Sequence, residues 1–444
     1  MLLVVALAGI LFLLFLVIHL KLQAFTALLL VSLLVGVAAG MPLNHILDSI
    51  KKGMGDTLGF VAVVVGLGAM FGRMLEISGG IERLARGLLE KFGESHAQWA
   101  LALTGFIVSI PIFFDVGFIL IVPLVHGLTR KTGRSLLYYG IPLLAGLAVT
   151  HSFVPPTPGP IAVAELLHAD LGWVILFGLL AGIPAMIIAG PLFAKYLAKR
   201  IHVNVPDYFD LQSPIHDREK DLPGLGAVAG IIFIPLFLIL LNTISSAALD
   251  EGILREVLAF AGHPFVALLI ATLLAFYIFG ARRGFSSEEV QSLATKALEP
   301  AGIIILVTGA GGVFKQILID SGVGKVLGEM MSVSGLPPLL LAFLAAAIIR
   351  IAQGSATVAM ITAAGIMSPI VATLELQGAI LGLMVIAIAA GASIASHVND
   401  SGFWLVNRYF GLSEKETLRS WTITSTLIAV MGFAVVFMLS LFVA

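Results

Sequence analysis

The sequence of 444 residues contains no cysteine, and only 11% of its residues are charged. The absence of cysteine excludes disulfide bonds and thiolate metal sites, although it says little about the cellular compartment. Soluble domains carry about 25% charged residues, so this composition cannot supply a surface that faces water on all sides. A net charge of −1 also provides no basic surface for nucleic acid.

Sequence patterns that would indicate an enzyme or an ATP-driven pump are missing as well. The sequence has no Gly-x-x-x-x-Gly-Lys loop for a nucleotide and no His-Glu-x-x-His pattern for a catalytic zinc. A serine hydrolase needs a base beside its nucleophile, and Ser355 has none nearby in the sequence. We therefore expect no catalysis, no metal and no cofactor, while a membrane-embedded enzyme and a passive channel remain as alternatives.

Apolar residues, in contrast, make up 59% of the chain and gather in long runs. A helix of about 20 residues crosses a hydrocarbon core of ~30 Å, and a helix satisfies its own backbone amides where lipid offers no partner. The sequence therefore predicts an all-α integral membrane protein, whose first twenty residues form a spanning helix rather than a removable signal. Runs of this length occur at 2–20, 24–40, 224–241 and 423–443.

Basic residues in the connections predict how the chain is oriented. The longest polar stretch, 195–221, contains five lysine and arginine residues and is predicted to lie in the cytoplasm. The connections 73–91 and 130–134 are also basic, so we expect both on the same face. A complete crossing between them would contradict this arrangement. We therefore predict a re-entrant hairpin at about 98–127, with Asp115 at its tip.

The second half of the chain repeats this plan. Two apolar arms at about 337–371 flank the polar interruption 350–357, which predicts a second re-entrant hairpin. Residues 71–79 also resemble residues 314–322, which indicates a duplication. An odd number of crossings between the two copies would invert one copy relative to the other.

The predicted fold is therefore a polytopic helical bundle of two inverted repeats, each with a re-entrant hairpin and broken helices. The repeats are residues 1–194 and 222–444, and the cytoplasmic linker is 195–221. Internal symmetry of this kind, with a binding site at broken helices near the midplane, is typical of secondary transporters. We expect a protein that carries a small solute across the bilayer.

Two charged residues at the predicted tips need an explanation, because a charge at membrane depth costs at least ~2.5 to 3.5 kcal/mol. Asp115 has two interpretations. It is a protonatable group that couples transport to protons, since a low-dielectric site favours the neutral carboxyl group, or it caps a helix. Arg350 either binds an anionic substrate through its planar fork or forms a structural ion pair with Asp115 or Asp400.

Three further segments combine polar side chains with interrupted helices. The second tip, 353–357, offers an amide, hydroxyls and free amides at a helix N-terminus, which attract anions. The proline-rich segment 151–160 cannot be helical throughout, and irregular backbone at membrane depth is tolerated only where it is buried or lines a cavity. Segment 396–402 likewise interrupts a helix with polar groups. The two histidines of these segments either relay protons or are structural.

These considerations give two sets of candidate residues. The predicted substrate-binding residues are Gln353, Gly354, Ser355, Thr357, Arg350, Asn399, Thr157 and Ser152, and the predicted proton-coupling residues are Asp115, Asp400, His151 and His397.

The sequence strings at these positions resemble the gluconate permease family of proton symporters. They are the tips 111–117 and 354–359, the run 396–404, and the strings 66–72 and 155–160. The resemblance extends over essentially the whole chain. One departure is Asp115, where relatives often carry glutamate, so that an acid remains but its reach is shorter.

The resemblance implies uptake of a small anionic sugar acid, gluconate or a related compound, with the proton as the coupling ion. It implies a multi-pass protein of the bacterial inner membrane, in which two opposed hairpins hold substrate in a moving domain against a static scaffold. Relatives that handle other hydroxy acids or D-serine provide an alternative substrate. A homodimer is a further expectation from the wider superfamily.

Overall fold

The computed structural model describes residues 2–206, 222–323, 325–326, 329 and 335–443. Residues 207–221 of the predicted cytoplasmic linker lie outside this part. The described residues form helices, connections and no strand. Eight of the described helices are long and apolar enough to cross a membrane. The chain is therefore an all-α, multi-pass membrane protein, as predicted.

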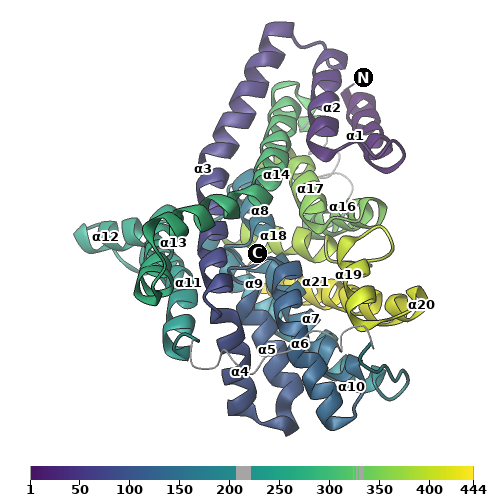
Figure 1. Cartoon of the computed structure of the whole chain (residues 1–444). Helices are drawn as coiled ribbons and strands as arrows, with labels where there is room; N and C mark the ends of the chain where they lie inside the picture. Colours follow the sequence, from purple (N-terminus) through teal and green to yellow (C-terminus); the bar gives the residue numbers. More distant parts are fainter. Residues whose placement is uncertain (1, 207–221, 324, 327–328, 330–334, 444) are drawn as a thin grey trace.

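The helices of the first half include one of 35 residues, α3, and a run of shorter helices that follow it (Figure 1). Their bounds are α1 Leu2–Ile18, α2 Ala24–Ala38, α3 Leu43–Ile77, α4 Gly80–Phe92, α5 Ala97–Val108, α6 Phe114–Thr132, α7 Leu136–Phe153, α8 Pro158–Leu167, α9 Leu171–Ile187 and α10 Phe193–Leu197.

The second half contains a similarly long helix, α14, followed by two helix pairs that are interrupted by short connections (Figure 1). The bounds here are α11 Leu225–Ala248, α12 Ile253–Ala261, α13 Pro264–Ala275, α14 Ser287–Asp320, α16 Pro338–Gln353, α17 Ala356–Thr373, α18 Ala379–Gly391, α19 Ser401–Phe410, α20 Glu414–Thr417 and α21 Ile423–Val443.

The predicted spans differ in how fully they form. The runs at 224–241 and 423–443 lie within helices long enough to cross the membrane. The two N-terminal runs form α1 and α2, which have only 17 and 15 residues and are shorter than the usual span of about 20. The sequence prediction overestimated both helices by two residues, because the first ends before His19 and the second ends before Gly40, whose φ is +79°.

Helices α3 and α14 pack against each other along much of their length. Their backbones touch where two glycines face each other: a Cβ added at Gly53 would lie 2.5 Å from the Gly312 carbonyl oxygen, and the reverse distance is also 2.5 Å. Helices α11, α12 and α13 lie together on one side of α3 (Figure 1). Side chains at the periphery remain exposed although they are apolar, for example Phe237 and Leu273, as expected for surfaces that face lipid.

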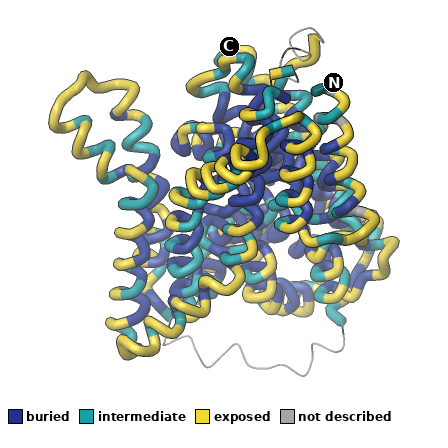
Figure 2. Tube along the Cα trace, turned by 90° about the horizontal axis from the view of Figure 1, so that it is seen from above, coloured by how far each residue is buried: buried dark blue, intermediate teal, exposed yellow. Residues whose placement is uncertain are grey.

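Buried residues are concentrated in the middle of the molecule, with exposed residues around them (Figure 2). Helix α7 is deeply enclosed, since most of its residues are buried. It approaches α5 so closely that a Cβ at Gly146 would lie 2.2 Å from the Ala102 carbonyl oxygen. Helix α18 approaches α16 in the same way, because a Cβ at Gly391 would lie 2.1 Å from the Phe343 carbonyl oxygen.

Both predicted hairpins correspond to pairs of helices that are broken at the predicted positions. Helix α5 ends at Val108 and α6 begins at Phe114, while α16 ends at Gln353 and α17 begins at Ala356. The second break requires glycine, because Gly354 has a φ of +90° and a Cβ there would lie 2.2 Å from the Asn399 carbonyl oxygen. The inverted relation of the two halves stays a prediction.

Candidate functional site

A cavity of about 570 Å³ lies where the two helix breaks face each other. The first break contributes residues 113–116 and the second contributes residues 353–357. The remaining walls come from α7, from the middle of α14, from the connection between α18 and α19 with the start of α19, and from residues 421–428 at the start of the last helical segment. Segments that are more than 200 residues apart in the sequence therefore enclose one space, which we call the central cavity.

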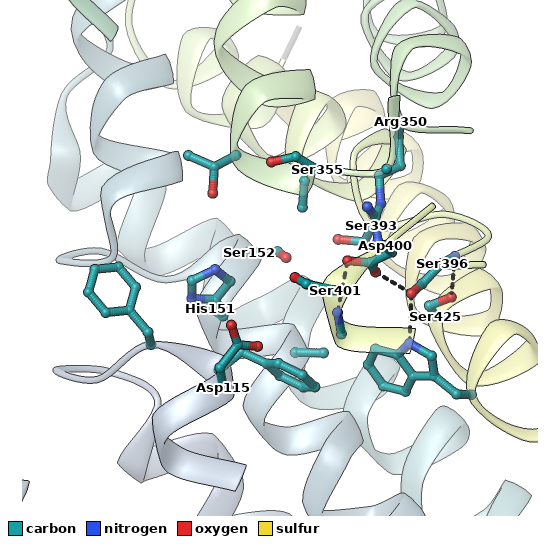
Figure 3. A pocket seen from close by; sticks show the side chains of 18 of the residues that line it. Asp115, His151, Ser152, Arg350, Ser355, Ser393, Ser396, Asp400, Ser401 and Ser425 are labelled. Atoms are coloured by element: carbon teal, nitrogen blue, oxygen red, sulfur yellow. Dashed lines mark hydrogen bonds and ion pairs between the residues drawn. The ribbon is translucent and has the colours of Figure 1, made fainter. Parts of the chain in front are cut away.

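Arg350 and Asp400 form an ion pair at one side of the central cavity (Figure 3). Nη2 of Arg350 donates a hydrogen bond to Oδ2 of Asp400, and the two side chains are only 5% and 13% exposed. The pair connects the end of α16 with the beginning of α19. Of the two interpretations of Arg350, the ion pair is therefore present in the structure, and its partner is Asp400.

The Asp400 carboxylate accepts hydrogen bonds from two further groups. Its Oδ2 accepts from the Ser396 hydroxyl. Its Oδ1 accepts from the Gly402 amide at 3.1 Å, so that Asp400 is the N-cap of α19. The Ser396 hydroxyl in turn accepts from the indole Nε1 of Trp421 at 2.7 Å. A chain of side chains thus fixes the carboxylate, and with it one edge of the Arg350 guanidinium.

The other donors of Arg350 are unused. Its Nε and Nη1 are buried and have no hydrogen-bond partner among the described residues. The same is true of Gln353 Oε1 and of His151 Nδ1, which belong to residues that line the cavity. Buried polar groups without partners are costly, so the cavity wall is suited to a polar guest that supplies the missing hydrogen bonds.

Asp115 lies on the opposite side of the central cavity, next to His151 (Figure 3). It belongs to the first turn of α6, and the N-cap of this helix is Phe113, which provides no side-chain hydrogen bond. The Asp115 carboxyl group has no hydrogen bond to any described residue, so it does not act as a helix cap here. Its oxygens are exposed to the cavity.

The second tip presents polar groups to the cavity, and hydrogen bonds to neighbouring residues hold its backbone in place. The Ser355 hydroxyl accepts a hydrogen bond from the Val358 amide at 3.4 Å and caps α17. The Ile351 carbonyl oxygen accepts hydrogen bonds from Nδ2 of Asn399 and from the ring of His397, both at 2.9 Å. These two contacts join the tip to the connection between α18 and α19.

Comparison with known proteins shows where this architecture belongs. A family model described as GntP family permease matches residues 1–442. The chain belongs to this permease family. It is 44% identical to the low-affinity gluconate transporter of Escherichia coli (strain K12), over 96% of this chain and 95% of the relative. It is 42% identical to the gluconate permease of Pseudomonas aeruginosa, over 98% and 97%.

A solved structure confirms the fold of the permease. The YdaH transporter of Alcanivorax borkumensis has a TM-score of 0.67 and 17% identity, and the match covers 93% of this chain and 96% of the other. At this identity the match shows the fold alone. Together the comparisons identify the chain as a transporter, not an enzyme, and as a multi-pass protein of the bacterial inner membrane.

The central cavity of the permease contains most of the predicted site residues. Those that line it are Asp115, His151, Ser152, Arg350, Gln353, Gly354, Ser355, Thr357, Asn399 and Asp400. Two predicted residues do not line it. The Thr157 hydroxyl, beside α8, donates to the Val154 carbonyl oxygen at 2.7 Å. The His397 ring contacts the Ile351 carbonyl oxygen at the end of α16. The functional role of each residue stays a prediction.

Several cavity residues of the permease were not among the predicted ones. Ser393, Ser401 and Ser425 add hydroxyl groups, Trp421 adds an indole, and Pro300 and Ile304 of α14 close one side. Single serines within apolar helices carry little signal, because a helix can satisfy a hydroxyl through its own backbone. Ser393 does so by donating to the Ala389 carbonyl at 2.8 Å. Only the fold reveals that these residues meet.

Proposed function

We propose that the permease takes up gluconate or a closely related sugar acid by symport with protons. The single observation that supports this proposal most strongly is the composition of the central cavity. It contains a guanidinium with two unused donors, several hydroxyl groups, and a carboxyl group without a partner on the opposite side. The gluconate transporters among the relatives make a sugar acid the first substrate to test.

The two chemical parts of a sugar acid match two parts of the cavity. A carboxylate pairs well with a guanidinium edge, since two parallel N–H donors fit its two oxygens. Asp400 takes one hydrogen of Nη2, so the second Nη2 hydrogen and an unused neighbour, Nε or Nη1, form such an edge on Arg350. The N-terminus of α17, immediately after Ser355, adds a positive helix end. In this proposal Arg350 and the start of α17 hold the carboxylate.

Hydroxyl groups then hold the polyol part. Ser152, Ser355 and Thr357 line the cavity together with the Asn399 amide. A cavity of about 570 Å³ lies within the usual range of about 300 to 1,000 Å³ for small-molecule sites. A site that pairs with hydroxyls discriminates strongly against analogues without them, because its own polar groups would be left without partners.

Proton coupling is assigned to Asp115 in this proposal. The oxygens of Asp400 already accept three hydrogen bonds, whereas those of Asp115 face the cavity without a partner. Asp115 in the neutral form would let the anion and one proton cross together without net charge. An uncompensated charge would instead work against about 2.3 kcal/mol per 100 mV of membrane potential. His151, beside Asp115 (Figure 3), is the second candidate for this role.

Uptake of labelled gluconate into proteoliposomes tests the proposal. An inward proton gradient is expected to accelerate uptake by the wild type. Asp115→Asn should abolish this acceleration but retain exchange of gluconate between the two sides, because exchange needs no net proton movement. Asp115→Glu, which keeps an acid, is the matched control and should restore part of the acceleration. An uptake rate of the wild type that does not change with the proton gradient would contradict proton symport.

Competition by unlabelled compounds identifies the ligand. Gluconate and related aldonates are expected to compete more strongly than glycerate or D-serine, since the longer polyols reach more of the hydroxyl groups. No observation in the cavity favours D-serine. The homodimer expected from the resemblance stays a prediction, to be tested by the mass of the purified permease in detergent.

A further inference from the structure

A second cavity of about 390 Å³ lies on the other side of the first helix break. It is enclosed by α3, by the beginning of α14 and by residues 111–113 of the break. Phe113, Val116 and Pro300 line both this cavity and the central cavity. The two spaces are therefore neighbours, and these three residues form the wall between them.

The wall is anchored to α3 by a close backbone contact. A Cβ added at Gly72 would lie only 2.1 Å from the carbonyl oxygen of Pro111, so the tip rests directly on this helix. On the other side of the wall, the Phe113 ring meets the His151 ring edge to face at 6.2 Å. A single aromatic side chain thus bridges from the second cavity to the polar centre of the first.

The second cavity is lined by charged side chains, unlike a lipid-facing crevice. Arg73 forms an ion pair with Glu76 at 2.6 Å, and Arg73 Nε is buried without a hydrogen-bond partner among the described residues. Lys296 and Glu299 lie across from them on α14. Lys296 is exposed and has no ion pair with any described residue. The cavity is therefore lined by two basic and two acidic side chains, and neither Lys296 nor Glu299 forms an ion pair with a described residue.

We propose that the second cavity is the inner vestibule of the transport route and binds the anionic substrate weakly before its release. In this vestibule Lys296 attracts the carboxylate of the substrate, and Phe113 with Pro300 forms the barrier to the central cavity. The inference rests on the proposed function for the identity of the substrate. Its placement on the cytoplasmic side follows from the basic residues around α4.

The absence of native cysteine allows a test that needs no substrate. Ala69→Cys and Ala297→Cys place a thiol in the vestibule. A membrane-impermeant thiol reagent should label both in inside-out vesicles and neither in right-side-out vesicles. Leu269→Cys, at an exposed apolar position on α13, is the lipid-facing control and should resist labelling from both sides. Labelling of both vestibule cysteines from the outside alone, or from neither side, would overturn the vestibule.

The barrier is tested with a thiol in the central cavity, Ala148→Cys. Adding Phe113→Ala should speed its labelling from the cytoplasmic side severalfold, because the ring no longer separates the two cavities. The same substitution should leave the labelling rate of Ala69→Cys unchanged. An unchanged rate at position 148 would show that Phe113 is not the barrier.

The role of Lys296 is tested by the direction of transport. Lys296→Gln should raise the half-saturating gluconate concentration for efflux about two- to fivefold, the range of an exposed charge interaction, and leave that for uptake unchanged. Lys199→Gln removes another exposed lysine near the cytoplasmic end of α10 and should change neither. Equal changes in both directions would contradict a vestibule role. If no sugar acid is transported at all, the proposed function fails, while the labelling results still decide the vestibule.

Discussion

Arg350 donates from Nη2 to Oδ2 of Asp400, while its Nε and Nη1 remain without partners at the wall of the central cavity. The Arg350 guanidinium can therefore have two roles. Its bond to Asp400 joins α16 to α19, and its remaining N–H donors are available to a bound substrate. Removing either partner would leave a buried charge uncompensated, which typically costs about 3–5 kcal/mol in a protein interior, a large part of the about 5–15 kcal/mol by which proteins are stable.

A conservative change at position 350 should therefore reveal the second role. Arg350→Lys keeps the positive charge and its attraction to Asp400 but loses the planar fork. We expect the KM for gluconate to rise about tenfold or more, equivalent to about 1.4 kcal/mol, with little change in the amount of folded permease. Arg282→Lys, at an exposed arginine, is the control. An unchanged KM in Arg350→Lys would mean that the fork does not hold the substrate.

Trp421 lines the central cavity and is also expected to position the Arg350 guanidinium through Ser396 and Asp400. Its indole Nε1 donates to Ser396 at 2.7 Å, and Ser396 donates to Asp400. Trp421→Phe removes this donor but keeps an aromatic ring against Phe114, whose centroid lies 5.3 Å away. Loss of one net hydrogen bond of about 0.5–1.5 kcal/mol should raise KM about two- to tenfold and leave kcat nearly unchanged.

Trp404→Phe provides the matched control for this prediction. Its indole also donates one hydrogen bond, here to the Val398 carbonyl oxygen at 2.8 Å, but Trp404 does not line the central cavity. It should lose a similar amount of stability without the change in KM. Equal kinetic effects of the two substitutions would show that Trp421 acts only through general stability.

The fold was largely predictable from the sequence because its strongest signals are local. Long apolar runs mark spans, while the break at 111–115, with its proline and aspartate, and the polar interruption at 350–357 mark where helices end. The two breaks face a common cavity, and most candidate residues line it, since a polar group inside an apolar run requires an unusual environment. The overestimated N-terminal helices show the limit of this reasoning, because run length alone does not fix where a helix ends.

The partners of each residue were not predictable in the same way. The sequence left Arg350 with two possible partners, Asp115 and Asp400, and only the fold places one within hydrogen-bond distance and the other across the cavity. Trp421 and Ser425 lie at the polar end that leads into α21, where the sequence does not distinguish side chains that face the cavity from those that face water. Such contacts depend on packing between segments distant in the chain.

Close helix packing predicts a large effect of a single methyl group. A Cβ at Gly146 would lie 2.2 Å from the Ala102 carbonyl oxygen, whereas one at Gly127 on α6 would meet nothing within 4 Å. Gly146→Ala should lower the free energy of unfolding by about 1–3 kcal/mol through overpacking. Gly127→Ala should be neutral or stabilising by up to about 1 kcal/mol, because alanine favours a helix. Thermal unfolding in detergent measures both, and similar midpoints would contradict the close packing of α5 and α7.

The last prediction concerns the contact between Lys315 on α14 and His168 at the end of α8, whose Nζ and Nε2 are 3.0 Å apart. A lysine ammonium only donates, so Nε2 of His168 must be the acceptor and its ring must be neutral. Burial lowers the pKa of His168, the Lys315 charge lowers it further, and the Asp56 charge opposes both. The neighbouring Glu165 faces the same lysine.

The sign of the pH effect follows from this shift. Because the pKa of His168 in the folded permease is below the ordinary value of about 6.5, the unfolded chain binds more protons as the pH falls below that value. The contact therefore contributes fully above about pH 6.5 and is lost on acidification. His168→Gln should flatten the fall of the thermal midpoint between about pH 7 and 5, whereas His45→Gln, at an exposed histidine of α3, should not. Parallel pH profiles of wild type and His168→Gln would show that this histidine does not sense pH.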